Sequence, residues 1–207
     1  MSILNFLHSG GNKVSLTTPA SNPSSDITFK LPQADGSSGQ AIVTDGSGAL
    51  SFTSVPPAVE ADQWYLNSNV TSTIDPITDW VLSLKVATGM SLSSGVFTFP
   101  STGKWLITAN VLFRPQQAPN YDNMYFDFRI TTDGGSSFIH ATRAQSSGAG
   151  YNHLAQNGTG MFFFDVTNTS THKIKFTSGS IASGSYIHGQ SSLPRYTNLV
   201  FQKLGVT

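Results

Sequence analysis

Apolar and polar residues alternate in short runs along much of this chain, and the runs lengthen after about residue 61. A period of two residues is typical of strands that bury one face. The runs that predict strands are 63–66, 80–84, 96–99, 105–113, 124–130, 138–143, 160–166, 173–176 and 198–204. No run has the period of a long amphipathic helix. The chain is therefore predicted to be all-β, with an antiparallel two-sheet jelly roll after residue 61.

The segment before these strands contains far fewer apolar residues. Between Asp26 and Phe52 it has only short apolar pieces: Ile27, Phe29 and Leu31, then Ile42 and Val43, then Leu50 and Phe52. Asp-Gly and Ser-Gly pairs, which favour tight turns, separate them. Such a segment cannot build a core alone, so it needs partner strands. The prolines in the run 55–58, VPPA, end it, because they cannot continue a strand ladder. We predict two domains, 1–58 and 59–207.

Composition narrows the choice of partners. Charged residues make up 11% of the chain, under half of the roughly 25% typical of soluble domains. The 11 basic and 11 acidic residues give a formal net charge of +0, which argues against nucleic acid or an anionic membrane as a partner. A polar but nearly uncharged surface suits close packing in an assembly; an ordinary extracellular β domain fits it equally well.

The chain has no cysteine, so neither a disulfide framework nor a thiolate metal site is expected. The N-terminal run MSILNFLHSGG lacks the basic region and cleavage site of a secretory signal, and no apolar stretch predicts a transmembrane span. Stability must then come from packing or from oligomerisation.

The run 26–52, DITFKLPQADGSSGQAIVTDGSGALSF, resembles a short module of tailed-phage fibre and virion-surface proteins with the pattern LPxADGSSGQ…TDGSGxLSF. The resemblance implies an intertwined connector made by three chains, and hence a homotrimer located on the surface of a virus particle. Such a protein would be made in the host cytoplasm.

A second resemblance covers roughly residues 62–205. The run 95–107, GVFTFPSTGKWLI, is similar to a motif of C1q and tumour-necrosis-factor-like jelly rolls, with Trp105 in place of the usual Tyr or Phe. The run 196–204, YTNLVFQKL, matches the closing strand that lies centrally in one sheet of that family. This resemblance implies a C1q/TNF-like head in which three copies pack around a threefold axis through aromatic faces.

Candidate catalytic and metal-binding residues do not form a recognisable pattern. The histidines (His8, His140, His153, His172 and His188) lack the close spacing of zinc ligands, and no nucleophile elbow, phosphate-binding glycine loop or calcium loop occurs. Asp122 and Asp127 are an odd number of residues apart, which places them on opposite faces of a strand and makes them a poor acid pair. We expect no enzyme, no cofactor and no metal.

Aromatic residues are the candidates for the core and the trimer contacts. The run 161–164, MFFF, is apolar on both faces, which fits a strand covered by a sheet on one side and by a neighbouring subunit on the other. The candidate trimer or core aromatics are Trp105, Phe162, Phe164 and Phe201. A platform on which sugar rings stack is the alternative interpretation.

The long polar segments 114–123, 145–156 and 179–195 are expected at the ends of the jelly roll, where loops often carry binding sites. Amides and tyrosines can recognise sugars without charge, so Tyr151 and Tyr186 are candidate ligand contacts. Solvated loops without a ligand are at least as consistent with the sequence.

These observations favour a non-enzymatic, homotrimeric structural protein of a bacteriophage virion. Because the connector begins almost at Met1, a capsid decoration, cement protein or head-fibre spike is preferred to a long tail fibre. Residues 1–30 would then bind the major capsid protein or tail proteins. The candidate apolar anchors are Leu4, Phe6, Leu7, Val14 and Leu16.

The alternative is a short tail fibre or tail-tip protein that binds a host surface polysaccharide. A free, secreted C1q-like lectin is a third hypothesis, which the missing signal and cysteines disfavour.

Overall fold

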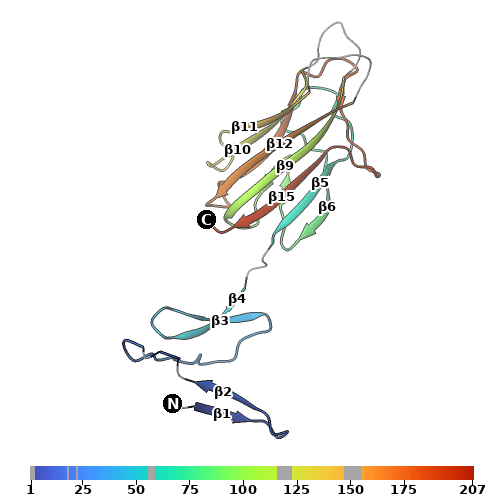
Figure 1. Ribbon diagram of the computed structural model, residues 1–207. Coiled ribbons are helices and arrows are strands. Elements are labelled where there is room, and N and C mark those ends of the chain that lie inside the picture. Colours follow the sequence, from blue (N-terminus) through green and yellow to red (C-terminus); the bar gives the residue numbers. More distant parts are fainter. Residues whose placement is uncertain (1–2, 18, 22, 56–58, 116–122, 147–154) are drawn as a thin grey trace. The chain divides into compact units, whose positions relative to one another are not determined.

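The chain divides into two units, Met1–Pro56 and Pro57–Thr207 (Figure 1). The computed structural model describes residues 3–17, 19–21, 23–55, 59–115, 123–146 and 155–207, with the backbone alone at 3–4 and 13–17. The domain boundary expected at residue 58 falls within 56–58, outside the described residues.

The first unit contains two separate β-hairpins. Strand β1 (Ile3–Leu7) pairs with β2 (Lys13–Thr17), and β3 (Gln40–Thr44) pairs with β4 (Leu50–Ser54). The second hairpin contains the expected apolar pieces at Ile42 and Leu50. The piece from Ile27 to Leu31, also expected to be a strand, forms only a single bridge from Lys30 to Ala49.

The turn between β3 and β4 follows from its sequence, DGSG. The Asp45 carboxylate accepts hydrogen bonds from the backbone N–H groups of Ser47 (2.7 Å) and Ala49 (3.0 Å). Gly46 and Gly48 have φ values of 82° and 91°, a region that residues with a Cβ atom rarely adopt. Gly48 also lies directly against the carbonyl oxygen of Thr28, so a larger residue there would displace the 26–31 segment from the turn.

Two antiparallel sheets form the second unit. The five-stranded sheet has the order β11 (Ile139–Gln145), β10 (Tyr125–Thr131), β13 (Lys173–Gly179), β8 (Val96–Thr98) and β7 (Ser91–Ser93). The six-stranded sheet has the order β12 (Gln156–Val166), β9 (Gly103–Arg114), β15 (Asn198–Gly205), β5 (Ala61–Leu66) and β6 (Trp80–Val86), with β14 (Tyr186–Ile187) paired to β9.

The predicted fold class is confirmed. Each of the nine predicted strand runs matches a strand, with at most one residue of the run outside it. The named strands pair antiparallel, and no helix occurs among the described residues. The closing strand β15 lies between β9 and β5, as the resemblance implied. The strands β7 and β14 were not predicted, because they are two or three residues long and carry little alternation.

Aromatic side chains fill much of the space between the two sheets. Phe97 is fully buried, and its ring contacts the rings of Trp64 and Phe201, both at 5.1 Å between centroids, and of Phe176 at 5.7 Å. Its ring also lies 6.5 Å from that of Trp80. Because Phe97 and Phe176 come from one sheet and Trp64, Trp80 and Phe201 from the other, these contacts join the two layers.

Replacing Phe97 by Ala should lower the free energy of unfolding by about 3–5 kcal/mol, since it leaves a cavity among rings from both sheets. The matched control is Ile139→Ala on β11, whose side chain is exposed, and which should change stability by about 0.5 kcal/mol or less. The measurement is denaturant unfolding at fixed protein concentration, followed by tryptophan fluorescence. All three tryptophans, at 64, 80 and 105, lie in the second unit and report its unfolding. Equal losses for the two variants would contradict the assignment of Phe97 as the link between the sheets.

Candidate functional site

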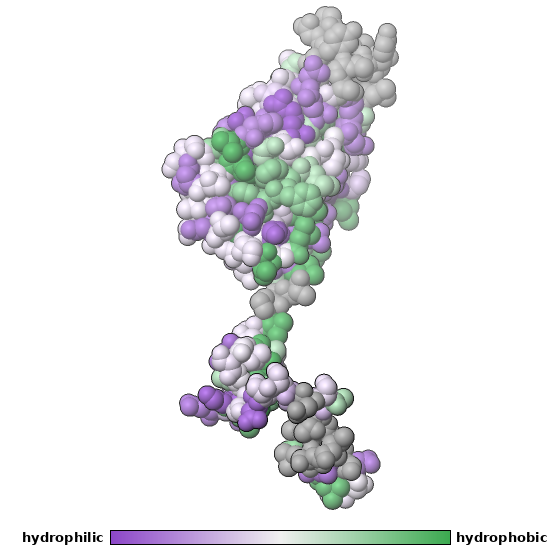
Figure 2. Space-filling model, turned by 60° about the vertical axis from the view of Figure 1, so that its left-hand side comes forward, coloured by the Kyte–Doolittle hydropathy of each residue, from purple (hydrophilic) through white to green (hydrophobic). Residues whose placement is uncertain are grey.

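The first unit has no buried core among its described side chains. Every one of them up to residue 55 is exposed or half-buried, including the larger apolar ones. The exposed apolar residues of this unit are Phe6, Leu7, Ile27, Phe29, Leu31, Ile42, Val43 and Val55, and Figure 2 shows hydrophobic residues at its surface. Burial of apolar area is the main source of folding free energy, and little of it is available within this unit.

The candidate anchors lie on the first hairpin. The register of β1 and β2 pairs Leu4 with Leu16 and Phe6 with Val14, so four of the five candidates are cross-strand partners. Phe6 and Leu7 are exposed. Phe6 and Leu7 therefore present apolar area to their surroundings, and the anchoring role of the five candidates remains a prediction.

In the second unit, one sheet carries an apolar outer surface. We call the outward side of the six-stranded sheet the assembly face. Its register places residues in rows across the strands: Met161, Thr108, Val200, Gln63 and Leu84 form one row, and Phe163, Leu106, Gln202, Ala61 and Val86 form the next. Both rows are apolar at their two ends, and between the ends each row has one half-buried apolar side chain, Val200 or Leu106, beside polar or small residues. The assembly face thus has one apolar flank on β12 and another on β6.

Hydrogen bonds between uncharged side chains continue the assembly face toward one end of the sheet. Thr159 donates to the amide oxygen of Asn110, whose amide nitrogen donates to Asn198, both at 3.3 Å. This ladder crosses β12, β9 and β15 without a charged group. A neighbouring protein surface can cover such a ladder at a much lower desolvation cost than it would incur over charges.

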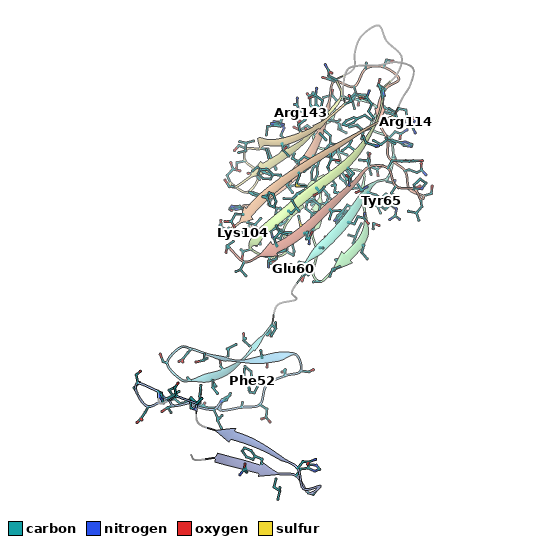
Figure 3. All side chains as sticks on the ribbon, in the orientation of Figure 1. Phe52, Glu60, Tyr65, Lys104, Arg114 and Arg143 are labelled. Atoms are coloured by element: carbon teal, nitrogen blue, oxygen red, sulfur yellow. The ribbon has the colours of Figure 1, made fainter. Side chains whose placement is uncertain are left out.

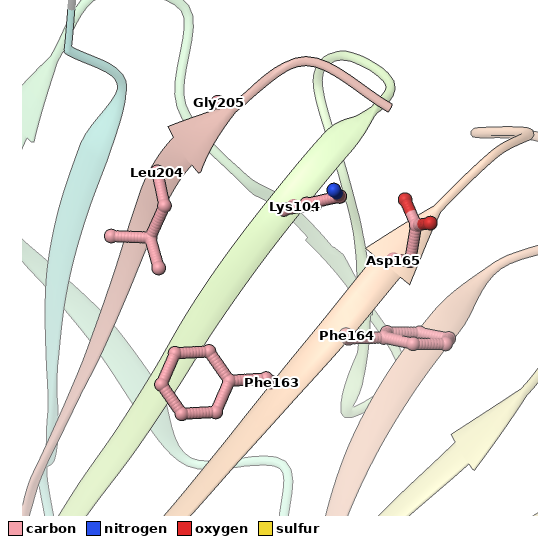
Figure 4. A pocket seen from close by; sticks show the side chains of 6 residues that line it. All are labelled: Lys104, Phe163, Phe164, Asp165, Leu204 and Gly205. Carbon is pink, nitrogen blue, oxygen red and sulfur yellow. The ribbon is translucent and has the colours of Figure 1, made fainter.

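A hollow of about 300 Å³ lies at the opposite end of the assembly face, lined by Lys104, Phe163, Phe164, Asp165, Leu204 and Gly205. Figure 4 shows Phe163 on β12 and Leu204 on β15 on either side of β9, with Lys104 and Asp165 at the strand ends. The lining is mostly apolar, and both Phe163 and Leu204 are more than half exposed. An apolar side chain of a partner would therefore fit here better than a charged ligand.

The predicted aromatic residues are placed mainly in the core of the single chain. Trp105, Phe164 and Phe201 are buried between the sheets, and Phe162 is half-buried against them. The aromatic residue of the 161–164 run that faces outward is Phe163, which was not among the candidates. The run 161–164 is apolar on both faces, so its sequence does not show which residues point outward. The register with β9 identifies them.

An aromatic cluster occupies the assembly face near β14. The His188 ring stacks on Tyr196 at 4.5 Å between centroids and meets the edge of Tyr186 at 5.6 Å. Burial, and secondarily the charge of Arg114, lowers the pKa of His188, so its neutral form is favoured. The predicted contact Tyr186 belongs to this cluster, whereas Tyr151 lies outside the described residues.

The described residues do not gather the side chains of a metal centre. They contain no group of three or more potential ligands among His, Asp and Glu, and no helix long and apolar enough to cross a membrane. His8 accepts a hydrogen bond from the backbone of Gly10, and His172 stacks on Phe164. His153 and Asp122 lie outside the described residues.

Two buried carboxylates, which the sequence analysis did not single out, belong to Asp62 on β5 and to Glu60 just before this strand. Asp62 accepts hydrogen bonds from the backbone of Met90 and from the Trp64 indole, and burial raises its pKa. Glu60 accepts a hydrogen bond from Lys203 at 2.9 Å. These contacts tie the 87–90 turn and the final strand to β5, which is a structural role.

The outward side of the five-stranded sheet carries a charged cluster around Asp127. Its carboxylate is completely buried and accepts two hydrogen bonds from Arg143, at 2.5 and 3.0 Å. His140 lies 3.1 Å from it, and Arg129 lies 3.4 Å from it. Burial alone would raise the pKa of Asp127, but the hydrogen bonds and charge of Arg143, together with His140, outweigh it and lower the pKa. The cluster therefore holds an ionised carboxylate beneath a layer of cationic side chains.

Comparison with known proteins bears on the fold. No protein-family model matches the chain, and no curated protein matches it. Among solved structures, the Eiger TNF protein of S. frugiperda is 12% identical with a TM-score of 0.53, over 73% of this chain and 96% of that protein. Murine APRIL, in its structure at pH 5.0, is 14% identical with a TM-score of 0.52, over 70% of this chain and 99% of that protein. The second unit thus has a TNF-like jelly-roll fold; identities this low establish nothing beyond the fold.

Asp127→Asn should lower the free energy of unfolding at neutral pH by about 2 kcal/mol, because two partly exposed guanidinium groups lose their anionic partner. Since the folded-state pKa of Asp127 lies below its unfolded value, its contribution is complete above the unfolded pKa and disappears as pH falls through the folded pKa. The difference in free energy of unfolding between the variant and the parent should therefore become smaller below about pH 4.

The measurement is chemical unfolding at a series of pH values, with the exposed Asp79→Asn as the matched control. The role of Asp127 would be refuted if its variant and the control lost equal stability at neutral pH, or if the difference between the variant and the parent stayed constant into the acid range.

Proposed function

We propose that this protein is a non-enzymatic homotrimer that forms a structural part of a bacteriophage virion, as a capsid decoration, cement protein or head-fibre spike. The observation that carries the self-association is the assembly face, where large apolar side chains such as Met161 and Phe163 are exposed on an ordered sheet. Isolated surface apolar residues are common, but a contiguous patch is typical of an interaction surface.

The arrangement of the two flanks favours a ring. The β12 flank (Met161, Phe163) and the β6 flank (Leu84, Val86) lie at opposite edges of one face, because their strands are the two edges of the sheet. If the β12 flank of one copy packs against the β6 flank of the next, each contact is head-to-tail, and a closed ring satisfies every flank. The resemblance to C1q/TNF-like jelly rolls implies that the ring has three members.

The first unit supports the same assembly. Its described side chains bury no core, so two further copies that supply neighbouring strands would cover Ile27, Phe29 and Ile42. Three chains intertwined in this way are what the resemblance of residues 26–52 to phage virion modules implies. That resemblance is also the support for a virion as the site of action.

The partner on the particle is proposed to be a major capsid protein bound by the first hairpin. The exposed side chains of Phe6 and Leu7 provide apolar area for such a contact. A short tail fibre or tail-tip protein is the second candidate, favoured by the aromatic cluster of Tyr186, His188 and Tyr196, since aromatic rings pack against sugars. The two candidates differ in the particle component to which the chain binds.

Phe163→Asp should convert the trimer into smaller species, because a carboxylate on the β12 flank would be buried without a partner. Leu84→Asp should act in the same way through the β6 flank. The measurement is the solution mass by light scattering on a sizing column, where the parent should have three times the mass of one chain.

Ile139→Asp is the matched control, because Ile139 and Phe163 are each 63% exposed and lie on different sheets. The control should remain trimeric. A monomeric parent would overturn the proposed assembly. A trimeric Leu84→Asp beside a dissociated Phe163→Asp would exclude the head-to-tail ring while keeping the β12 flank in the interface.

The double variant Phe6→Ser/Leu7→Ser should lose binding to phage particles assembled without this protein, since it removes apolar contact area from the first hairpin. Its solution mass should stay that of a trimer. Cosedimentation with tail-less capsids and with isolated tails measures the binding and separates the two candidates. Undiminished binding of the double variant would refute the anchoring role, and binding of the parent to tails alone would favour the fibre.

A further inference from the structure

The Asp127 cluster combines more positive than negative charge on one patch of the five-stranded sheet. The register places Asp127 opposite Arg143 on β11, and Arg129 opposite both His140 on β11 and Lys175 on β13. Lys175 forms an ion pair with Asp75, with 2.6 Å between its Nζ atom and Oδ1 of the carboxylate. The two guanidinium groups therefore share one carboxylate. This patch keeps an excess of positive charge even when His140 is counted as neutral, although the formal net charge of the whole chain is +0.

Asp127 cannot satisfy all the donors around it. A guanidinium group carries several N–H donors, and a carboxylate offers only two oxygens to the pair of arginines and His140. The Nε atom of Arg129 is buried and has no hydrogen-bond partner among the described residues. The side chains of Arg129 and Arg143 are 35% and 36% exposed, so each remains partly accessible to a ligand from solvent.

The patch is held in place before any ligand arrives. The Arg143 guanidinium lies 3.8 Å from the centroid of the Tyr125 ring and also donates two hydrogen bonds to Asp127. The Tyr125 ring in turn packs over Gly179, where a Cβ atom would collide with it. A ligand that binds here has little side-chain entropy to remove, which favours affinity. Figure 3 shows the position of Arg143 in the second unit.

We propose that Arg129, Arg143 and His140 form a binding site for a single oxyanion, a carboxylate or a phosphate group carried by a small or sugar-like ligand. A planar guanidinium group can bind two oxygens of a carboxylate or of a phosphate at once, and the buried Asp127 fixes the orientation of both groups without neutralising both. One such group fits the patch better than a nucleic acid, whose closely spaced phosphates require a longer basic surface. The site lies on the sheet opposite the assembly face, so it is independent of the proposed assembly.

Calorimetric titration of the full chain at low ionic strength tests this site, with D-glucuronate and inorganic phosphate as the probes and glucose as the neutral control. We expect binding of at least one anion, weakening as salt is added, and no binding of glucose. Arg129→Met should reduce the affinity by roughly tenfold or more, the loss expected for one charge-assisted hydrogen bond. Arg129 is the residue to alter, because the closer pair of Arg143 and Asp127 then still supports the fold.

Lys30→Met in the first unit removes one positive charge elsewhere and should keep the parent affinity, which excludes a general charge effect. Tryptophan fluorescence verifies that each variant is folded. Binding of glucuronate alone identifies a carboxylate ligand such as an acidic sugar, binding of phosphate alone identifies a phosphorylated one, and binding of both indicates recognition of the oxyanion charge. The proposal is overturned if neither anion binds at millimolar concentration, if glucose binds equally, or if Arg129→Met binds like the parent.

Discussion

The packing of aromatic rings between the two sheets of the second unit is the constraint on which its surfaces depend. Phe97 and Phe176 from one sheet meet Trp64, Trp80 and Phe201 from the other, and these contacts fix the distance and register of the layers. Alternate residues of each strand must then point outward. The composition of those outward positions decides what each face of the second unit can contact.

The two outward faces differ in chemistry. On the six-stranded sheet, apolar flanks such as Phe163 and an uncharged ladder through Asn110 leave a surface that another protein can cover at low desolvation cost. On the five-stranded sheet, the charges around Asp127 are already partly neutralised within the chain. A partner chain suits the first face, whereas a small anion suits the second. The same fold therefore offers two separate surfaces of different chemistry.

The first unit poses the opposite problem, because its described side chains bury no core. Backbone pairing and the tight turn at Asp45 give it local order, but the described apolar side chains, such as Phe29 and Ile42, remain uncovered. A two-stranded hairpin is only marginally stable alone in water. Association would supply the missing burial, which connects the stability of this unit to the assembly proposed for the second.

The sequence by itself determined the all-β class, nine of the strands of the second unit and the shortage of apolar residues for a core near the N-terminus. These properties depend on local alternation, on turn residues and on the amount of apolar area available. Tertiary structure decided which residues share a face. Phe163 faces outward while Phe164 faces the core, because the register with β9 selects one of two faces that are both apolar in sequence. Likewise, Asp127, His140 and Arg143 come together only through the pairing of β10 with β11, since register brings distant residues together and no local pattern encodes it.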